Sequence, residues 1–185
     1  MKSRPGASKK LGLAKKWRFW LFDPMVVFEK LAESHWPEVW AIQEPVFRAG
    51  ETYPYPVDIS EAEAKTYWMN PPLESYVAVN NGAVLGVFYI RPNQPSLGAH
   101  VCNCGYVASP AAAGQGIGAQ MCEWSQIEAR RLGYSAMQYN LVVASNTRAV
   151  ALWQRLGFGV VGNLPKAFKH AKLGLVDALI MYKEL

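Results

Sequence analysis

The chain has 185 residues, a length that suits one domain, because two domains of this size would each have a marginal core. About half of the residues, 51%, are apolar, which excludes a wholly disordered chain. No apolar run reaches the ~18–20 residues that cross a bilayer, so we expect no membrane span.

The formal net charge of +5 is concentrated at the start of the chain. Residues 1–22 hold seven of the 19 Lys and Arg and no acid, which leaves 12 cations against 14 acids afterwards. We therefore expect a basic N-terminal extension over 1–22 and a domain over 23–185. The extension would attract an acidic partner, anionic lipid or nucleic acid, or simply be a solvated tail. We expect no specific nucleic-acid partner, and the sequence leaves a homodimer open.

Cysteine usage indicates a reduced compartment. Cys102 and Cys104 share one face of a predicted strand and cannot form a relaxed disulfide with each other. Cys122 is the third cysteine, and no second cysteine or histidine pair lies at zinc-ligand spacing. We therefore expect a cytoplasmic protein without a metal.

The first predicted elements are a short strand over Met25–Leu31 and a helix that opens at Ser34. Pro45 is expected to end or kink this helix. A loop over Gly50–Pro56 follows. The sequence Ser-Glu-Ala-Glu at 60–63 is a capping box, which predicts a second helix to about Met69.

A hairpin is predicted next, with strands over Tyr76–Val79 and Val84–Ile90 around an Asn-Asn-Gly turn at 80–82. Val101–Ala108 is expected to form a strand, and a glycine-rich loop then leads into a helix that ends near Leu132.

A strand over Ala136–Val143 and a helix from Asn146 to Leu156 follow. Strands are then expected over Phe158–Val161 and Val176–Tyr182. The intervening segment Gly162–Gly174 reads as a long loop, either a lid over the site or plain surface. The resulting order β-α-α-β-β-β-α-β-α-β-β predicts an α/β fold with about seven strands.

The glycine-rich loop, Gly-Gln-Gly-Ile-Gly at 114–118, lies between a predicted strand and a predicted helix. Helix N-termini have N–H groups without intrahelical partners, and glycines let a pyrophosphate approach them closely. A GxGxG pattern alone is equally compatible with a tight turn. No Lys-Ser/Thr pair follows it, so it is not a Walker A loop, and the upstream meander does not fit a Rossmann unit.

A second segment of the sequence indicates which kind of glycine-rich loop this is. Residues 146–158 read Asn-Thr-Arg-Ala-Val-Ala-Leu-Trp-Gln-Arg-Leu-Gly-Phe. Together with Val107–Gly118, this segment resembles the Gcn5-related N-acetyltransferase (GNAT) superfamily, with its V-x-P-x-x-R/Q-x-x-G-x-G/A and N-x-x-A-x-x-L-Y-x-x-x-G-F signatures. The resemblance implies a central, mixed and mostly antiparallel sheet of about seven strands flanked by about four helices. It also implies acetyl-CoA as the acyl donor.

The resemblance assigns coenzyme contacts to the glycine-loop amides, to the strand before the loop, and to the helix after Asn146. The residues concerned are Tyr106, Val107, Ala108, Ala113, Gly114, Gln115, Gly116, Ile117, Gly118, Ala119, Asn146 and Trp153.

Two positions depart from the family pattern. Ala113 stands where relatives carry Arg or Gln, which removes one polar partner of the phosphates but leaves the backbone cradle. Trp153 stands where many relatives carry a tyrosine that protonates the departing thiolate. An indole N–H is no useful acid. Trp153 is therefore either a coenzyme contact or a packing residue.

Amine acetylation needs a base for the amine proton and a donor for the oxyanion. The resemblance places that donor on the strand before the loop, at the Val107 N–H. Glu44 is the candidate base, or else a solvated helix acid. Asn103 shares a face with apolar residues and either contacts substrate or makes an internal hydrogen bond. Further candidates for the acceptor site are Thr52, Tyr53 and Asn140.

We therefore expect an N-acetyltransferase that transfers acetyl from acetyl-CoA directly to a primary amine of a small molecule. A protein or peptide N-acetyltransferase is the second hypothesis. The third is a non-catalytic, coenzyme A-binding regulatory module, which Ala113 and Trp153 would support.

Overall fold

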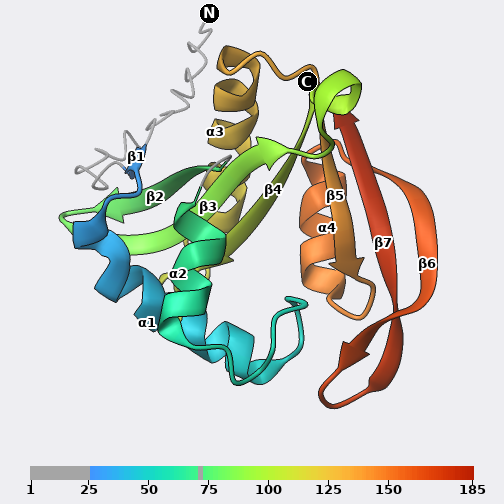
Figure 1. Cartoon of the computed structure of the whole chain (residues 1–185), viewed down its shortest axis with the longest axis horizontal. Helices are drawn as coiled ribbons and strands as arrows, with labels where there is room; N and C mark the ends of the chain where they lie inside the picture. Colours follow the sequence, from blue (N-terminus) through green and yellow to red (C-terminus); the bar gives the residue numbers. More distant parts are fainter. Residues whose placement is uncertain (1–25, 71–72) are drawn as a thin grey trace, which may run out of the picture.

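A computed structural model describes residues 26–70 and 73–185 (Figure 1). Its strands are β1 (Val27–Lys30), β2 (Glu74–Asn80), β3 (Ala83–Pro92), β4 (Val101–Ala108), β5 (Ala136–Val143), β6 (Gly159–His170) and β7 (Gly174–Glu184). Its helices are α1 (Trp36–Ala49), α2 (Glu61–Met69), α3 (Ile117–Arg131) and α4 (Thr147–Arg155), with 3-10 turns at Glu33–His35, Ser96–Gly98 and Pro110–Ala112. The basic extension expected over 1–22 lies outside the described residues.

All seven strands form one sheet in the order β1-β2-β3-β4-β5-β7-β6. Every neighbouring pair is antiparallel except β4 and β5, which are parallel. The sheet and its four helices confirm the predicted fold class and element order.

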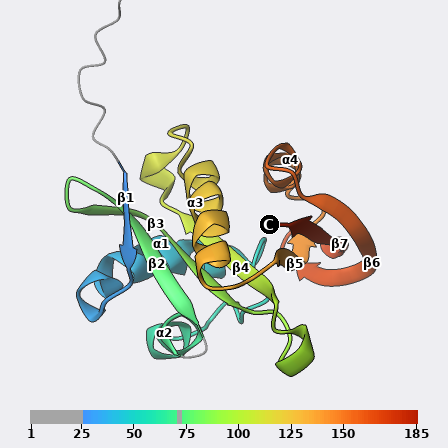
Figure 2. The same ribbon diagram turned by 90° about the horizontal axis from the view of Figure 1, so that it is seen from above.

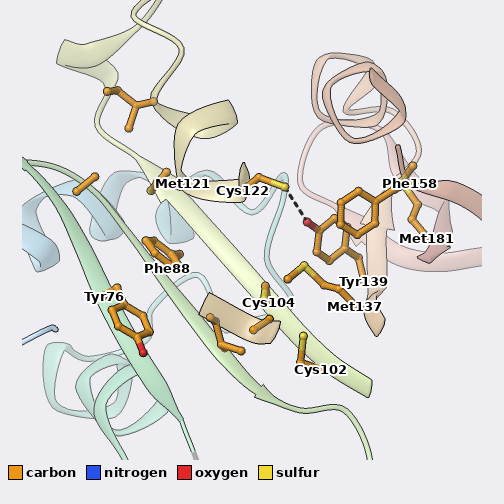
Figure 3. Packing of buried hydrophobic residues seen from close by; sticks show 14 of the residues in the cluster. Tyr76, Phe88, Cys102, Cys104, Met121, Cys122, Met137, Tyr139, Phe158 and Met181 are labelled. Carbon is orange, nitrogen blue, oxygen red and sulfur yellow. Dashed lines mark hydrogen bonds between the residues drawn. The ribbon is translucent and has the colours of Figure 1, made fainter. Parts of the chain in front are cut away.

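The helices cover both faces of the sheet. Helices α1 and α2 lie on one face, and α3 and α4 lie on the other (Figures 1 and 2). The α3 side holds a core cluster that includes Phe88, Met121, Tyr139 and Phe158 (Figure 3). All three cysteines are free and buried in it. The α1 side holds a second cluster around Trp68.

Local signals in the sequence explain several boundaries. Ser60 and Glu63 form the predicted capping box, because the Ser60 N–H donates to Glu63 Oε2 at 2.9 Å and the Glu63 N–H donates to Ser60 Oγ at 3.3 Å. The hairpin between β2 and β3 turns at Asn81 and Gly82, with φ angles of 50° and 80°. A two-residue turn of this hand matches the twist of the paired strands.

Two boundary predictions are wrong. Pro45 does not end α1, which continues to Ala49; the proline is exposed, so the missing N–H donor lies on the solvent side of the helix. The segment Gly162–Gly174 is no lid loop, since most of it belongs to β6, which pairs with β7 to form a long hairpin.

Strands β4 and β5 stay together over only two residue pairs. Val101 pairs with Ala136 and Cys102 with Met137, after which the two strands separate. At the next position Asn103 Nδ2 donates to the Gln138 carbonyl at 2.9 Å, so a side chain replaces the backbone ladder where the strands part. The fold therefore opens a wedge-shaped gap in the middle of its sheet.

None of the helices among the described residues is long and apolar enough to cross a membrane.

Candidate functional site

The open edge of β4 presents backbone groups to the gap. The β3–β4 ladder includes the bonds Asn93 N–H to Val101 O and Ser109 N–H to Leu85 O, both at 2.8 Å. Because hydrogen-bonded pairs alternate along an antiparallel ladder, Val107 in this register faces Val87 of β3. The N–H and C=O groups of the residues on either side of it, Tyr106 and Ala108, therefore point into the gap.

A cavity of about 520 Å³ passes through this gap, within the range of small-molecule sites. It brings together nine of the residues expected from the sequence, namely Thr52, Tyr53, Asn103, Tyr106, Val107, Ala108, Asn140, Asn146 and Trp153. They come from the loop after α1, from β4 and β5, and from α4. Segments far apart in the sequence thus converge where the sheet divides.

The glycine loop lies at the end of β4 and leads into α3. Gly114 and Gly116 have backbone φ angles of 82° and 73°, which residues other than glycine rarely adopt. The N–H groups of Gly114, Gly116, Ile117 and Gly118 have no backbone partner within the described part of the chain. Such a cluster of free donors at a helix N-terminus fits a pyrophosphate.

Two amides of the expected cradle are already engaged. The N–H of Ala113 donates to Pro110 O at 3.1 Å, and that of Gln115 donates to Ala112 O at 3.2 Å. The Ala119 amide likewise bonds to Gly116 O at 3.0 Å. These three residues shape the loop, so the donors available to phosphates are the amides of the glycines and Ile117.

Helix α4 faces the glycine loop across the gap. Asn146 caps this helix, because its Oδ1 accepts a hydrogen bond from the Ala149 N–H at 3.1 Å. Its side-chain Nδ2 can therefore donate a hydrogen bond to a molecule in the cavity. Trp153 packs against Tyr106 and Tyr139, with ring centroids 5.2 Å and 5.1 Å apart. Trp153 therefore both packs on tyrosines of the sheet and lines the cavity.

The hydroxyls of Tyr106 and Tyr139 point away from the acceptor side. Tyr106 OH lies 2.7 Å from Ser125 Oγ, and Tyr139 OH donates to Tyr106 OH at 3.3 Å. Tyr139 OH also contacts Cys122 Sγ at 3.3 Å (Figure 3). Burial raises the pKa of both tyrosines well above the ordinary value of 10, so both are neutral hydrogen-bonding groups in the core.

Aromatic rings wall the α1 side of the cavity. Tyr53 stacks on Tyr55 with a centroid distance of 5.7 Å and an interplanar angle of 3°, and Tyr55 stacks on Tyr67 at 5.1 Å. Thr52 Oγ1 is buried and has no hydrogen-bond partner among the described residues. A buried hydroxyl without a partner favours a contact with a bound molecule.

Asn103 and Asn140 stand at the narrow end of the cavity. Asn103 is buried and uses both ends of its side-chain amide. Its Oδ1 accepts from Tyr89 OH at 3.2 Å, and its Nδ2 donates to the Gln138 carbonyl oxygen. Asn140 donates to Asn93 Oδ1 at 2.7 Å and accepts from Gln138 Nε2 at 2.8 Å. Asn103 therefore makes the internal hydrogen bonds of one expectation and also lines the cavity, and its contact with a substrate stays a prediction.

Two of the expected reaction groups need correction. Glu44 pairs with Arg48 on α1 at 3.2 Å and is not among the residues that line the cavity, so it is poorly placed as a base. The Val107 N–H faces β3 in the ladder and cannot also donate into the gap. On the gap side the corresponding group is the Tyr106 N–H.

Sequence reasoning missed Arg91 and Tyr89. Both line the cavity, with the Arg91 guanidinium 5.2 Å from the Tyr89 ring centroid. Arg91 is the only charged side chain among the described lining residues. The alternation of Val87, Tyr89 and Arg91 along one strand is a local signal that they share a face, whereas their position beside Asn103 depends on the β3–β4 register.

The wide end of the gap is bridged on the α1 side. Gly50, which caps α1 at a φ of 59°, accepts a hydrogen bond from the Ala171 N–H at 3.0 Å. Next to it Lys172 pairs with Glu51 at 2.5 Å, and this contact lowers the pKa of the Glu51 carboxyl. The tip of the β6–β7 hairpin is thereby attached to the end of α1.

Among the described residues no group of His, Cys, Asp and Glu side chains is arranged to hold a metal ion.

Comparison with known proteins identifies relatives of this arrangement. Residues 36–158 match the acetyltransferase (GNAT) family. The N-acetyltransferase aca1 of Schizosaccharomyces pombe is 31% identical over 150 residues, which cover 71% of each chain.

Solved structures share the fold. A Gcn5-related N-acetyltransferase from Kribbella flavida superposes with a TM-score of 0.82 at 36% identity, over 86% of this chain and 98% of that one. A GNAT superfamily phosphinothricin acetyltransferase from Sinorhizobium meliloti, solved in complex with acetyl-CoA, has a TM-score of 0.75 at 20% identity, over 86% and 88% of the two chains.

Proposed function

Because the chain belongs to the acetyltransferase (GNAT) family and is an N-acetyltransferase, we propose that its acceptor is the primary amine of a small molecule that carries an acidic group. The observation that carries this proposal is the charge of the cavity. Arg91 is the one charged side chain among the described lining residues. None of the ion pairs between described residues includes it. A guanidinium in that position binds a carboxylate or a similar anion.

The size and walls of the cavity support a small acceptor. Tyr53, Tyr55 and Tyr67 line its α1 side, and the hydrogen bond between Ala171 and Gly50 lies next to it, around a neighbouring pocket that Tyr53 and Tyr55 also line. A volume of about 520 Å³ that also receives the end of the donor leaves little room for a folded protein segment. A protein or peptide acceptor is therefore the weaker hypothesis.

The two substrates would reach the gap from opposite faces. The free amides of the glycine loop would hold the donor's phosphates, while Asn146 and Trp153 flank its thioester end on the α3 side. The acceptor would occupy the α1 side with its acid on Arg91, near Thr52 and Asn103. The Tyr106 N–H, which points into the gap, is the donor we propose for the oxyanion.

The test compares amines that differ only in whether their carboxylate is free or capped. Release of free thiol from acetyl-CoA is measured for amino acids, for the same compounds with the carboxylate capped as an amide, and for short peptides. We expect the capped compounds to show a roughly 10- to 100-fold higher KM, since a charge-assisted contact is worth about 1.5–3 kcal/mol. In Arg91→Gln this difference should largely vanish.

Three outcomes would contradict the proposal. Peptides with a higher kcat/KM than any small amine would favour protein acetylation. Equal KM values for acidic and capped amines would exclude the role of Arg91. Thermal stabilisation by acetyl-CoA without thiol release on any amine or peptide would favour a regulatory, coenzyme-binding role.

A further inference from the structure

The acetyl transfer moves one proton from the amine nitrogen to the coenzyme sulfur, and the cavity offers few groups to carry it. The described residues that line it include no Asp, Glu, His or Lys. The thiol of Cys104 lies in the buried α3-side cluster, and burial raises its pKa well above the ordinary value. Hydroxyl groups are the remaining proton carriers of the lining.

Of the hydroxyls on the acceptor side, which include those of Thr52 and Tyr55, the one of Tyr53 is hydrogen-bonded to the edge of the gap. Tyr53 OH donates to the Tyr106 carbonyl oxygen at 3.0 Å. That carbonyl is on the open edge of β4, next to the N–H that we assign to the oxyanion. Tyr53 therefore places a proton donor where an amine from the α1 side would meet a thioester from the α3 side.

Of the other five tyrosines in the lining, three use their hydroxyls elsewhere, Tyr67 is largely exposed, and Tyr55 makes no hydrogen bond to β4 among the described residues. Tyr89 OH donates to Asn103, and the hydroxyls of Tyr106 and Tyr139 bond to each other in the core on the opposite face. Tyr67 is more than half exposed, at 53%. Only Tyr53 bonds to the open edge of β4 among the described lining tyrosines.

The ring of Tyr53 is held in place by its neighbours. Besides its stacking on Tyr55, it meets Phe47 edge-on with a centroid distance of 5.5 Å, and Trp68 lies at 6.0 Å. A ring fixed on several sides keeps its hydroxyl in one position, which is what proton transfer between two closely spaced atoms requires.

We propose that the Tyr53 hydroxyl carries the proton from the acceptor nitrogen to the departing sulfur. This inference rests on the proposed amine acetylation. The neutral amine attacks the thioester carbon and forms the C–N bond. As the C–S bond breaks, sulfur takes the hydroxyl proton of Tyr53, and the phenolic oxygen takes a proton from the nitrogen. The products are the amide and the free thiol, and Tyr53 ends in the form in which it began.

Two observations support a transfer in which the hydroxyl donates one proton and accepts another in the same step. Burial raises the pKa of Tyr53 well above 10, so the hydroxyl is protonated at neutral pH and a free tyrosinate is disfavoured. In addition, Trp153 stands beside the gap without an acidic proton for the sulfur. A shuttle meets both conditions because it never leaves a charge on the ring.

The experiment compares Tyr53→Phe with Tyr134→Phe, which removes a hydroxyl from a tyrosine outside the cavity lining. Steady-state rates are measured with acetyl-CoA and the best amine of the wild-type panel. We expect kcat of Tyr53→Phe to fall by about 10²–10⁴-fold, the usual contribution of positioned proton transfer. The KM for acetyl-CoA and the thermal stabilisation by acetyl-CoA should stay close to wild type, and Tyr134→Phe should keep its kcat.

A second measurement uses the wild-type protein alone. Single-turnover rates are recorded in mixtures of H₂O and D₂O. Two protons in flight make the rate depend on the deuterium fraction along a curve, whereas one proton gives a straight line. We expect the curve.

Several results would overturn the inference. These are a kcat for Tyr53→Phe within about threefold of wild type, a straight-line dependence in the wild type, or a loss of acetyl-CoA stabilisation in the variant, which would mean that Tyr53 only positions the donor. Failure of the proposed function is seen separately, as a wild-type protein that releases no thiol with any amine.

Discussion

At the scale of single residues, the arrangement of the acceptor side depends on a glycine that leaves space for a neighbouring ring. Gly105 lies on β4 opposite Tyr89 of β3, and a Cβ atom at Gly105 would lie 2.7 Å from Cε1 of the Tyr89 ring. Glycine therefore lets this ring lie across β4, where its hydroxyl reaches Asn103. The same ring lies against the Arg91 guanidinium, so one glycine fixes three polar groups of the cavity.

We predict that Gly105→Ala displaces the Tyr89 ring. Overpacking of this kind destabilises by about 1–3 kcal/mol, and the shift of Tyr89 and Asn103 should raise the amine KM while acetyl-CoA still stabilises the protein. Thermal unfolding and steady-state kinetics measure both effects. Gly159→Ala is the matched control, since the nearest atom to its Cβ would be 4.0 Å away. An unchanged amine KM in Gly105→Ala would contradict the prediction.

The sequence yields candidate residues more readily for the donor side than for the acceptor side. The glycine loop and the segment from Asn146 are each continuous in sequence, so a local pattern is enough to find them. Arg91, Tyr89 and Asn103 meet only through the β3–β4 register, which no local pattern gives. The position of Glu44 near the end of a predicted helix does not decide between a base and a solvated helix acid, and its ion pair with Arg48 one turn later fits the solvated acid.

At the scale of elements, a buried carboxylate joins α3 to the sheet. Glu128 of α3 accepts a hydrogen bond from Tyr76 OH of β2 at 2.7 Å, and Arg131 donates to both of its oxygens at 2.6 Å and 2.7 Å. The Arg131 bonds, with the Tyr76 bond, lower the pKa of the Glu128 carboxyl. The carboxylate form therefore contributes to the stability of the folded state.

This contact predicts a dependence of stability on pH. A carboxyl whose pKa is lower in the folded than in the unfolded state stabilises the fold above its unfolded pKa of about 4.5, and this contribution is lost as the pH falls through the folded pKa. Glu128→Gln should be about 1–3 kcal/mol less stable at pH 7, and the difference should shrink below pH ~4. Urea unfolding at several pH values measures it, with the exposed Glu123→Gln on the same helix as control. A difference independent of pH would refute this role.

Elements with strong local signals were predicted closely, as the bounds of β4 and β5 demonstrate. Strand β6 was underestimated because its pairing with β7 shifts register between Val160 and Gly162 and again between Leu164 and Phe168. Such bulges break the alternation on which strand prediction relies, and Pro165 adds a further loop signal. An edge strand tolerates both features.

At the scale of the whole molecule, the charge is distributed unevenly along the sequence. The residues after position 22 carry 12 cations and 14 acids, so the strongly basic part of the chain precedes the residues that the structure describes. The fold class followed from the order of elements together with two short motifs. The acceptor did not, because the cavity is lined by residues from several separate segments.

We predict that acetyl-CoA stabilises the full chain and a variant that lacks residues 1–22 to the same extent. At a concentration 100 times Kd, binding adds about 2.7 kcal/mol, which for a domain of this length raises Tm by about 5–10 °C. Thermal unfolding with acetyl-CoA and with coenzyme A measures the shift. A smaller shift in the shortened variant would mean that the extension contributes to donor binding.

The bridge between the hairpin tip and the end of α1 has a consequence for how the molecule is loaded. Strands β4 and β5 meet at Cys102 and Met137, and the Ala171–Gly50 bond joins the same two halves again at the other end. The gap is thus bounded by a closed ring of covalent chain and hydrogen bonds. If the acetyl end of the donor enters the gap from the α3 side, as proposed above, we expect these two bonded ends to limit the length of acyl group that fits between them.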